Sequence, residues 1–300
     1  MTADHSPRFF DPRTLANLHG LQLRARTIVE GYLAGRHHSP LRGHSTEFAE
    51  HREYSPGDDL RSVDWKVFAR TDKYYVKQFE DETNLICYLV VDVSESMAYR
   101  GPDSPLSKLE YAQSLAAALA WLVLQQQDAV SLVTFDDQIR ATVSPSNSPA
   151  QLKHVLQVLE DAKPVAPTRA GAVFHELAEK FAKRGIVILL SDLFDDHAKV
   201  AAGLHHLRHQ RHDVAVWHLL DAAEVDFPFS RSMSFHGLEA GARIVADAPA
   251  IRAAYLTEMR GFLQSVQRTC REQAIEYCQV RTDQPFDQTL SSFLTRRMAK

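Results

Sequence analysis

Four short apolar runs divide the central part of the chain. They cover residues 85–91, 129–135, 186–191 and 214–220, and each is rich in Val, Ile and Leu. Hydrophobic residues that follow one another without polar alternation are typical of strands covered on both faces. We therefore expect four buried strands inside one sheet.

Segments with a helical period lie between these runs. Ser104-Pro105 places a capping hydroxyl before a proline, which predicts the start of a helix over 106–127. The run Ser148-Pro149-Ala150-Gln151 repeats this arrangement, and its glutamine predicts a capping box at the start of the next helix. Strands that alternate with helices predict an α/β fold with a doubly wound, mostly parallel sheet and right-handed crossovers.

The remaining segments suggest a division into three parts. Residues 1–35 are expected to form an N-terminal helical segment. Residues 36–83 are polar, with little helical period and a turn at Ser55-Pro56-Gly57-Asp58, so we expect a small β-rich element there. Residues 84–300 are expected to form the α/β domain, with a hairpin insertion near 225–247.

Composition and charge narrow the possible environments and partners. The hydrophobic share of 45% and the net charge of -4 are ordinary for a soluble globular chain and give no electrostatic reason to expect nucleic acid. No apolar run approaches the length of about 18 residues that suggests a membrane span. The first residues lack the apolar core of a signal peptide, and the three cysteines form no C-x-x-C pair. We expect a cytoplasmic protein without a membrane span.

Oxygen-bearing side chains follow the first buried strand at alternate positions. Asp92, Ser94 and Ser96 come directly after the apolar run, and residues two apart in an extended chain point the same way. Asp192 follows another predicted strand in the same manner. Because ligands bind outside the carboxyl ends of parallel strands, these oxygens are placed to share one edge of the sheet. Such hard ligands suit a divalent cation of the magnesium class.

The α/β pattern and this set of side chains resemble a von Willebrand factor A domain. That family carries a metal-ion-dependent adhesion site for Mg2+, Mn2+ or Ca2+. The resemblance implies that Ser94 and Ser96 touch the metal directly, while Asp92 and Asp192 act largely through water or hydrogen bonds. Thr168 matches the remaining position of the family's metal site.

Asp192 is followed by Leu193, where many relatives have a glycine. Asp195 and Asp196 could therefore substitute for Asp192 or add charge. A simpler interpretation of the first motif is that Ser94 and Ser96 only cap the turn into the next helix.

Residues 43–79 carry a second and longer resemblance. They contain Gly43-His44-Ser45-Thr46-Glu47-Phe48, Arg52-Glu53-Tyr54-Ser55-Pro56-Gly57-Asp58-Asp59, Arg61-Ser62-Val63-Asp64-Trp65-Lys66 and Val76-Lys77-Gln78-Phe79. This signature resembles the bacterial family called domain of unknown function fifty-eight, in which it precedes a von Willebrand A-like domain. Members are commonly encoded beside MoxR-type AAA+ ATPases. The resemblance implies such an ATPase, or its client protein, as partner.

These observations favour a non-enzymatic interaction module that binds a partner carboxylate through the divalent cation. One alternative is a magnesium-dependent phosphohydrolase with Asp92 as nucleophile, although Ser94 stands where a second carboxylate is normally needed. Another is a scaffold with a vestigial metal site. His205 and His209 have the spacing of helical zinc ligands, but without an acidic or cysteine partner a solvated helix face is the favoured interpretation.

Overall fold

The computed structural model describes residues 11–18, 20–35, 51–53, 74–77, 85–237 and 243–291. The chain divides into two compact units, one made of Met1–His37 with Leu85–Lys300 and the other of His38–Asn84. Among the described residues of the smaller unit, β1 (His51–Glu53) pairs antiparallel with β2 (Tyr75–Lys77). Most of the signature at 43–79, with Trp65, lies outside the described residues.

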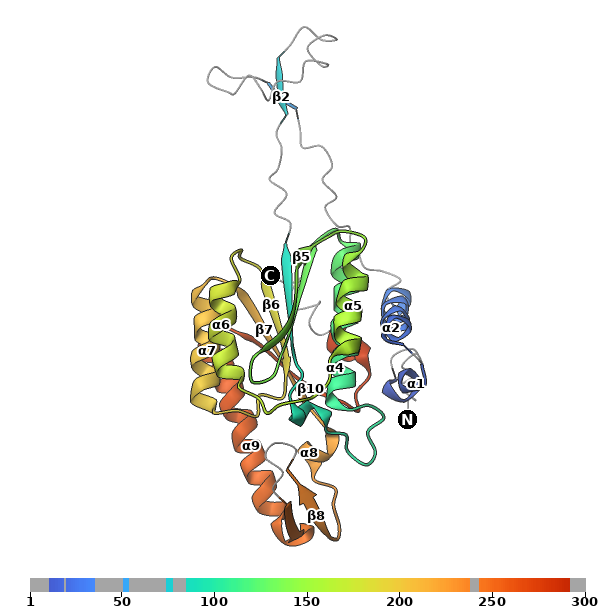
Figure 1. Ribbon diagram of the computed structural model, residues 1–300, viewed down its shortest axis with the longest axis vertical. Helices are drawn as coiled ribbons and strands as arrows, with labels where there is room; N and C mark the ends of the chain where they lie inside the picture. The colour runs from blue at the N-terminus through green and yellow to red at the C-terminus, as the bar shows by residue number, and fades with distance from the viewer. Residues whose placement is uncertain are drawn as a thin grey trace. The chain divides into compact units, whose positions relative to one another are not determined.

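A six-stranded sheet forms the centre of the larger unit (Figure 1). Its strand order is β10-β7-β6-β3-β4-β5, and all neighbouring pairs are parallel except β4 with β5. The prediction of a mostly parallel α/β sheet is thus confirmed, and all four predicted buried strands belong to it. The strands are β3 (Ile86–Asp92), β4 (Ala129–Phe135), β5 (Ile139–Ser146), β6 (Ile186–Ser191), β7 (Asp213–Leu220) and β10 (Glu276–Arg281).

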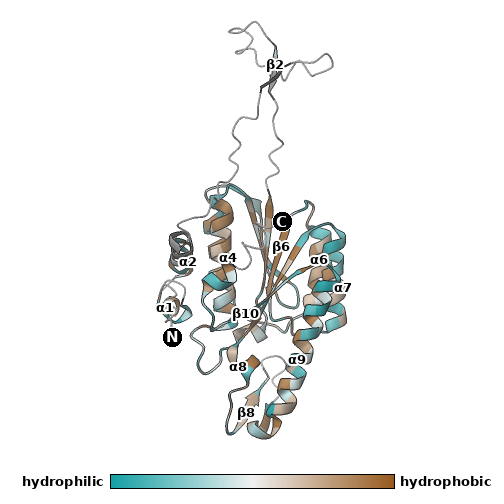
Figure 2. Cartoon of the chain, turned by 180° about the vertical axis from the view of Figure 1, so that it is seen from behind, coloured by the Kyte–Doolittle hydropathy of each residue, from teal (hydrophilic) through white to brown (hydrophobic). Residues whose placement is uncertain are grey.

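Helices cover both faces of this sheet (Figure 1). Alternate residues of β3 point to opposite faces, so Leu89 belongs to one buried cluster and Val90 to the other. The first cluster lies beneath α2 (Leu21–Gly35), α4 (Lys108–Gln125) and α5 (Gln151–Asp161), with the short α1 (Pro12–Ala16) beside them. The second lies beneath α6 (Ala170–Lys180), α7 (His197–His209) and the carboxyl-terminal part of α9 (Ala248–Glu272). Hydropathy follows this layering, because the strands are apolar and the outer helix faces carry the polar residues (Figure 2).

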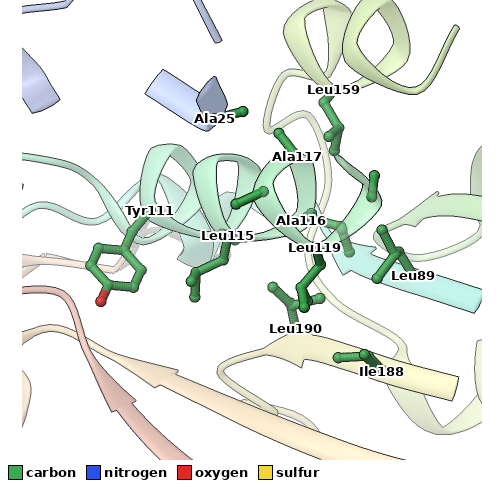
Figure 3. Close-up of a cluster of buried hydrophobic side chains, with 14 of the residues drawn as sticks. Ala25, Leu89, Tyr111, Leu115, Ala116, Ala117, Leu119, Leu159, Ile188 and Leu190 are labelled. Atoms are coloured by element: carbon green, nitrogen blue, oxygen red, sulfur yellow. The ribbon is translucent and has the colours of Figure 1, made fainter. Parts of the chain in front are cut away.

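Helix α4 is the most deeply buried helix of the first layer. Leu115 and Leu119 point from it toward the strands, where Leu190 meets them, while Ala117 points toward Ala25 of α2 (Figure 3). Small residues on the outer side of α4 let α2 pack closely on it. Both sides of α4 are therefore apolar, and its position against the sheet is fixed by packing on two sides.

Two helix starts differ from the sequence prediction. The N-cap of α4 is Ser107, not Ser104, and its side chain forms a capping box with Glu110. At α5 the N-cap is Ala150, without a side-chain capping bond. Gln151 instead donates from Nε2 to the backbone oxygens of Val130 and Ser144, at 2.7 and 2.8 Å. The predicted capping box was therefore wrong, because this glutamine serves the neighbouring strands.

A hairpin follows the strand β7. The short helix α8 (Ala222–Asp226) leads into β8 (Ser232–His236), which pairs antiparallel with β9 (Arg243–Asp247), and α9 begins directly afterwards. No helix in the described ranges has both the length and the hydrophobicity needed to cross a membrane.

Candidate metal centre

Asp92 is the last residue of β3 and is fully buried. Its Oδ1 accepts the backbone N–H of Ser94 at 2.9 Å, and its Oδ2 accepts the hydroxyl of Ser191 at 2.6 Å. Ser191 lies on the adjacent parallel strand β6. These two bonds fix the carboxylate between the ends of two neighbouring strands.

Ser94 and Ser96 lie in the turn that follows β3, and both are buried. Ser94 is by position the N-cap of the short 3-10 helix η2 (Glu95–Ala98), but its side chain makes no capping hydrogen bond. Its Oγ lies 3.1 Å from the Oγ of Ser96 instead. The interpretation that Ser94 merely caps this turn is therefore wrong, and the two hydroxyls converge as the alternate spacing predicted.

Asp192 follows β6 and is also fully buried. Its Oδ2 accepts a hydrogen bond from Lys108 Nζ at 2.8 Å, and its Oδ1 accepts the backbone N–H of Phe194 at 3.2 Å. Leu193, between them, has a φ of 54°, in the left-handed region that usually favours glycine. The turn after Asp192 therefore has a backbone conformation typical of glycine, although the residue there is a leucine whose side chain is buried in the core.

Thr168 lies on the loop before α6 and is buried. Two backbone hydrogen bonds hold this loop against the strand ends. Ala166 O accepts from the N–H of Glu95, at 3.0 Å, and Arg169 N–H donates to Asp136 O, also at 3.0 Å. The loop that carries Thr168 is thus tied directly to the turn between Ser94 and Ser96.

The two buried carboxylates influence each other. Burial and, to a smaller extent, the charge of Asp192 together raise the pKa of Asp92 to about 7, against the lowering effect of the hydrogen bonds from Ser191 and Ser94. Two acidic groups are therefore buried close enough at this edge of the sheet to repel each other. A bound cation would relieve this repulsion.

Lys108 is a site residue that the sequence did not reveal. It is the first residue of α4 and fully buried, and its ammonium contacts Asp192 and also Glu224 Oε1 of α8, at 2.7 Å. Burial alone lowers the pKa of Lys108, but the two carboxylates outweigh it and the net pKa is raised. A cation in the first turn of a helix opposes the helix dipole. That anomaly is the one sequence signal that could have pointed to buried acidic partners.

Asp195 and Asp196, the other acidic candidates near Asp192, accept hydrogen bonds from backbone N–H groups. Asp196 caps α7 by accepting from Ala198 and Lys199, and Asp195 accepts the backbone N–H of Gly171 at 3.1 Å. Both carboxylates therefore accept backbone N–H groups at the start of a helix. His205 and His209 are exposed, as expected for a solvated helix face.

The predicted donor set has the chemistry that a small hard cation prefers, and not that of a zinc site. Across the described part of the chain, no three His, Cys, Asp or Glu side chains are grouped to hold a metal. The predicted set has instead two carboxylates and three hydroxyls. Adjacent ligands of an octahedral Mg2+ lie about 2.9 Å apart, since each bond is about 2.0–2.1 Å long. The 3.1 Å between Ser94 Oγ and Ser96 Oγ is close to that separation.

Known proteins resemble the chain in both structure and sequence. Among solved structures, BatB from Bacteroides thetaiotaomicron is 14% identical with a TM-score of 0.49, covering 72% of this chain and 100% of that chain. An aerotolerance-related membrane protein from Bacteroides fragilis is 16% identical with a TM-score of 0.46, covering 69% and 96%. No functional property of this chain follows from these likenesses.

Sequence relatives cover nearly the whole chain. Uncharacterized proteins of Mycobacterium bovis and Mycobacterium tuberculosis are each 26% identical over 298 residues, which are 96% of this chain and 90% of theirs. A family match covers residues 50–262, most of the larger unit and part of the signature. The chain therefore belongs to the family described as "Protein of unknown function DUF58".

Proposed function

We propose that this protein is a non-enzymatic interaction module, which binds a carboxylate of a partner protein through a divalent cation. Ser94 and Ser96 supply oxygens that touch the metal, and Thr168 takes the remaining position of the site. Asp92 and Asp192 act through water or hydrogen bonds, as in the metal-ion-dependent adhesion site of von Willebrand factor A domains. The observation that carries the proposal is the pair of buried hydroxyls 3.1 Å apart beside a buried carboxylate.

The hydrogen bonds of the two carboxylates support an outer role for them. Each oxygen of Asp92 and of Asp192 already accepts a bond from the protein. These carboxylates therefore hold charge near the cation without having to surround it. With mainly neutral hydroxyl ligands, a bound Mg2+ keeps much of its charge and still favours an anionic oxygen from outside.

The same bonds argue against the phosphohydrolase alternative. A nucleophilic carboxylate must reach the substrate with a free oxygen. Asp92 is fully buried and both of its oxygens are held by Ser94 and Ser191. The vestigial-scaffold alternative differs from our proposal only in whether a cation binds.

The partner is a MoxR-type AAA+ ATPase or a client protein of that ATPase. This part of the proposal rests on the family signature in residues 43–79. Preferred cations are Mg2+, Mn2+ or Ca2+, and the cytoplasmic location stays a prediction from the sequence.

Pull-down from lysate with wild-type protein and Asp92→Ala, each with magnesium and with chelator, tests the proposal. We expect the partner only with wild-type protein and magnesium. Asp226→Ala is the control, because it removes an exposed carboxylate that pairs with Arg281. Equal recovery of the ATPase in all lanes would rule out metal-dependent capture.

A further inference from the structure

Lys108 forms ion pairs with two carboxylates, those of Asp192 and Glu224. Its ammonium donates to Asp192 Oδ2 at 2.8 Å and to Glu224 Oε1 at 2.7 Å, and no part of its side chain is exposed. The ring of Phe194 lies over the same ammonium, with 4.7 Å between the nitrogen and the ring centroid. A lysine so enclosed is held in one place by packing as well as by charge.

This position gives Lys108 two effects on Asp192. Its positive charge offsets the charge that Asp192 would present to a cation. Its hydrogen bond also holds Oδ2, so that Asp192 cannot turn that oxygen toward the metal. Both effects weaken the protein's own hold on a cation and leave the cation more electropositive.

We propose that Lys108 is a positioning residue that sets the charge of the metal site in favour of an external carboxylate. It lowers the affinity for the cation and raises the affinity of the loaded site for the partner's acidic group. This inference rests on the proposed function and adds to it the residue that tunes the site's selectivity.

Glu224 keeps Lys108 in place from the other side. Its Oε2 accepts the backbone N–H of Asp221 at 2.8 Å, within the capping box of α8. The backbone oxygen of Glu224 also accepts the hydroxyl of Tyr255 at 2.9 Å, which ties α8 to α9. Lys108 is therefore supported by a rigid helix start rather than by a free side chain.

In Lys108→Met we expect the affinity for Mn2+ and the affinity of the loaded site for a carboxylate to change in opposite directions. Calorimetric titration of the full chain with Mn2+ alone gives the first. We expect Mn2+ to bind about tenfold more tightly than to wild-type protein, because Asp192 loses the ammonium that offsets its charge and holds its Oδ2. The second measurement is water-proton relaxation by the bound Mn2+ during titration with acetate. Acetate should displace metal-bound water less readily from the variant.

Two further variants separate this role from damage to the fold. Lys108→Met leaves Glu224 buried without its cation, which destabilises the protein. Lys108→Met with Glu224→Gln removes that second charge, and we expect the same two shifts, smaller in size. Lys180→Met is the control, since Lys180 makes an exposed ion pair with Glu176.

Weaker or unchanged Mn2+ binding in both Lys108 variants would overturn the inference and leave the proposed function standing. Absence of Mn2+ binding to wild-type protein would overturn both. If Mn2+ binds more tightly but acetate displaces water as readily as in wild-type protein, Lys108 does not set carboxylate preference and the inference fails.

Discussion

Single residues at the strand ends combine burial with charge in ways that hydropathy does not show. Asp92, Lys108 and Asp192 are fully buried; Asp92 accepts the hydroxyl of Ser191, and Lys108 and Asp192 form an ion pair. Removing one partner of such a pair leaves an uncompensated charge in a place without water, which is more damaging than losing an exposed ion pair. Leu193 lies in the same region. Its left-handed backbone sets the direction in which the chain continues after Asp192.

A buried histidine that packs against Tyr88 of β3 gives a prediction for how stability depends on pH. The ring of His212 is buried and packs edge-on against Tyr88 and Phe181. Burial lowers the pKa of His212 below its ordinary 6.5. The unfolded chain therefore binds this proton more readily, and the free energy of unfolding falls as pH drops below about 6.5.

His212→Phe removes that proton and should lessen the loss of stability on acidification. Urea unfolding of the wild type and of the variant between pH 7.5 and pH 5 measures how far the free energy of unfolding falls in each. His209→Phe, at an exposed position, is the control and should follow wild type. A decline of the same size in His212→Phe would show that this ring is not the group responsible.

Elements could be predicted from sequence to very different degrees. The buried strands were predicted within a residue or two, because a continuous apolar run has few other uses. The capping residues of the helices were not, since two serines lie near the start of α4 and only Ser107 has Glu110 three residues later. Lys108 could not be paired with Glu224 from sequence, as 116 residues separate them and only the fold brings α8 to α4.

The cap of α4 gives a prediction that separates these two serines. Ser107→Ala should lower the free energy of unfolding by about 0.5–2 kcal/mol, because it leaves the backbone N–H of Glu110 without its acceptor. Ser104→Ala should change it by less than about 0.5 kcal/mol, the usual range for a position away from such features. Urea denaturation of both variants is the measurement. The reverse order would restore Ser104 as the cap.

The crossing of α6 and α7 depends on two glycines. A Cβ built on Gly171 would lie 2.6 Å from backbone and side-chain carbons of Lys199, and one on Gly203 would lie 2.8 Å from Gly171 O. Gly171→Ala should therefore destabilise the protein by about 1–3 kcal/mol, since the helices must move apart.

Gly261→Ala is the matched control in α9, where a Cβ would meet nothing within 4 Å. It should stabilise the helix by about 0.5–1 kcal/mol, the usual gain from glycine to alanine in a helix interior. Thermal unfolding compares the two. Equal shifts would mean that the helix crossing tolerates the added carbon.

At the scale of the whole molecule, the sheet brings residues from distant parts of the chain to one edge. Asp92 and Asp192 are a hundred positions apart in sequence, but β3 and β6 are adjacent and parallel, so both residues lie at the same end of the sheet, with Ser191 beside Asp92. The mostly parallel α/β sheet could be predicted from the alternation of strands and helices, but the order of its strands could not. The hydrogen bonds that fix each oxygen could not, because they depend on side-chain packing between loops.

The central claim is that the oxygens of this edge bind a divalent cation. Calorimetric titration of the wild type with Mn2+ tests it most directly, with the double variant Ser94→Ala, Ser96→Ala and the exposed control Ser230→Ala measured alongside. We predict a single saturable site in the wild type and the control, and its loss in the double variant. The same Mn2+ affinity in all three proteins, or none in the wild type, would contradict the claim.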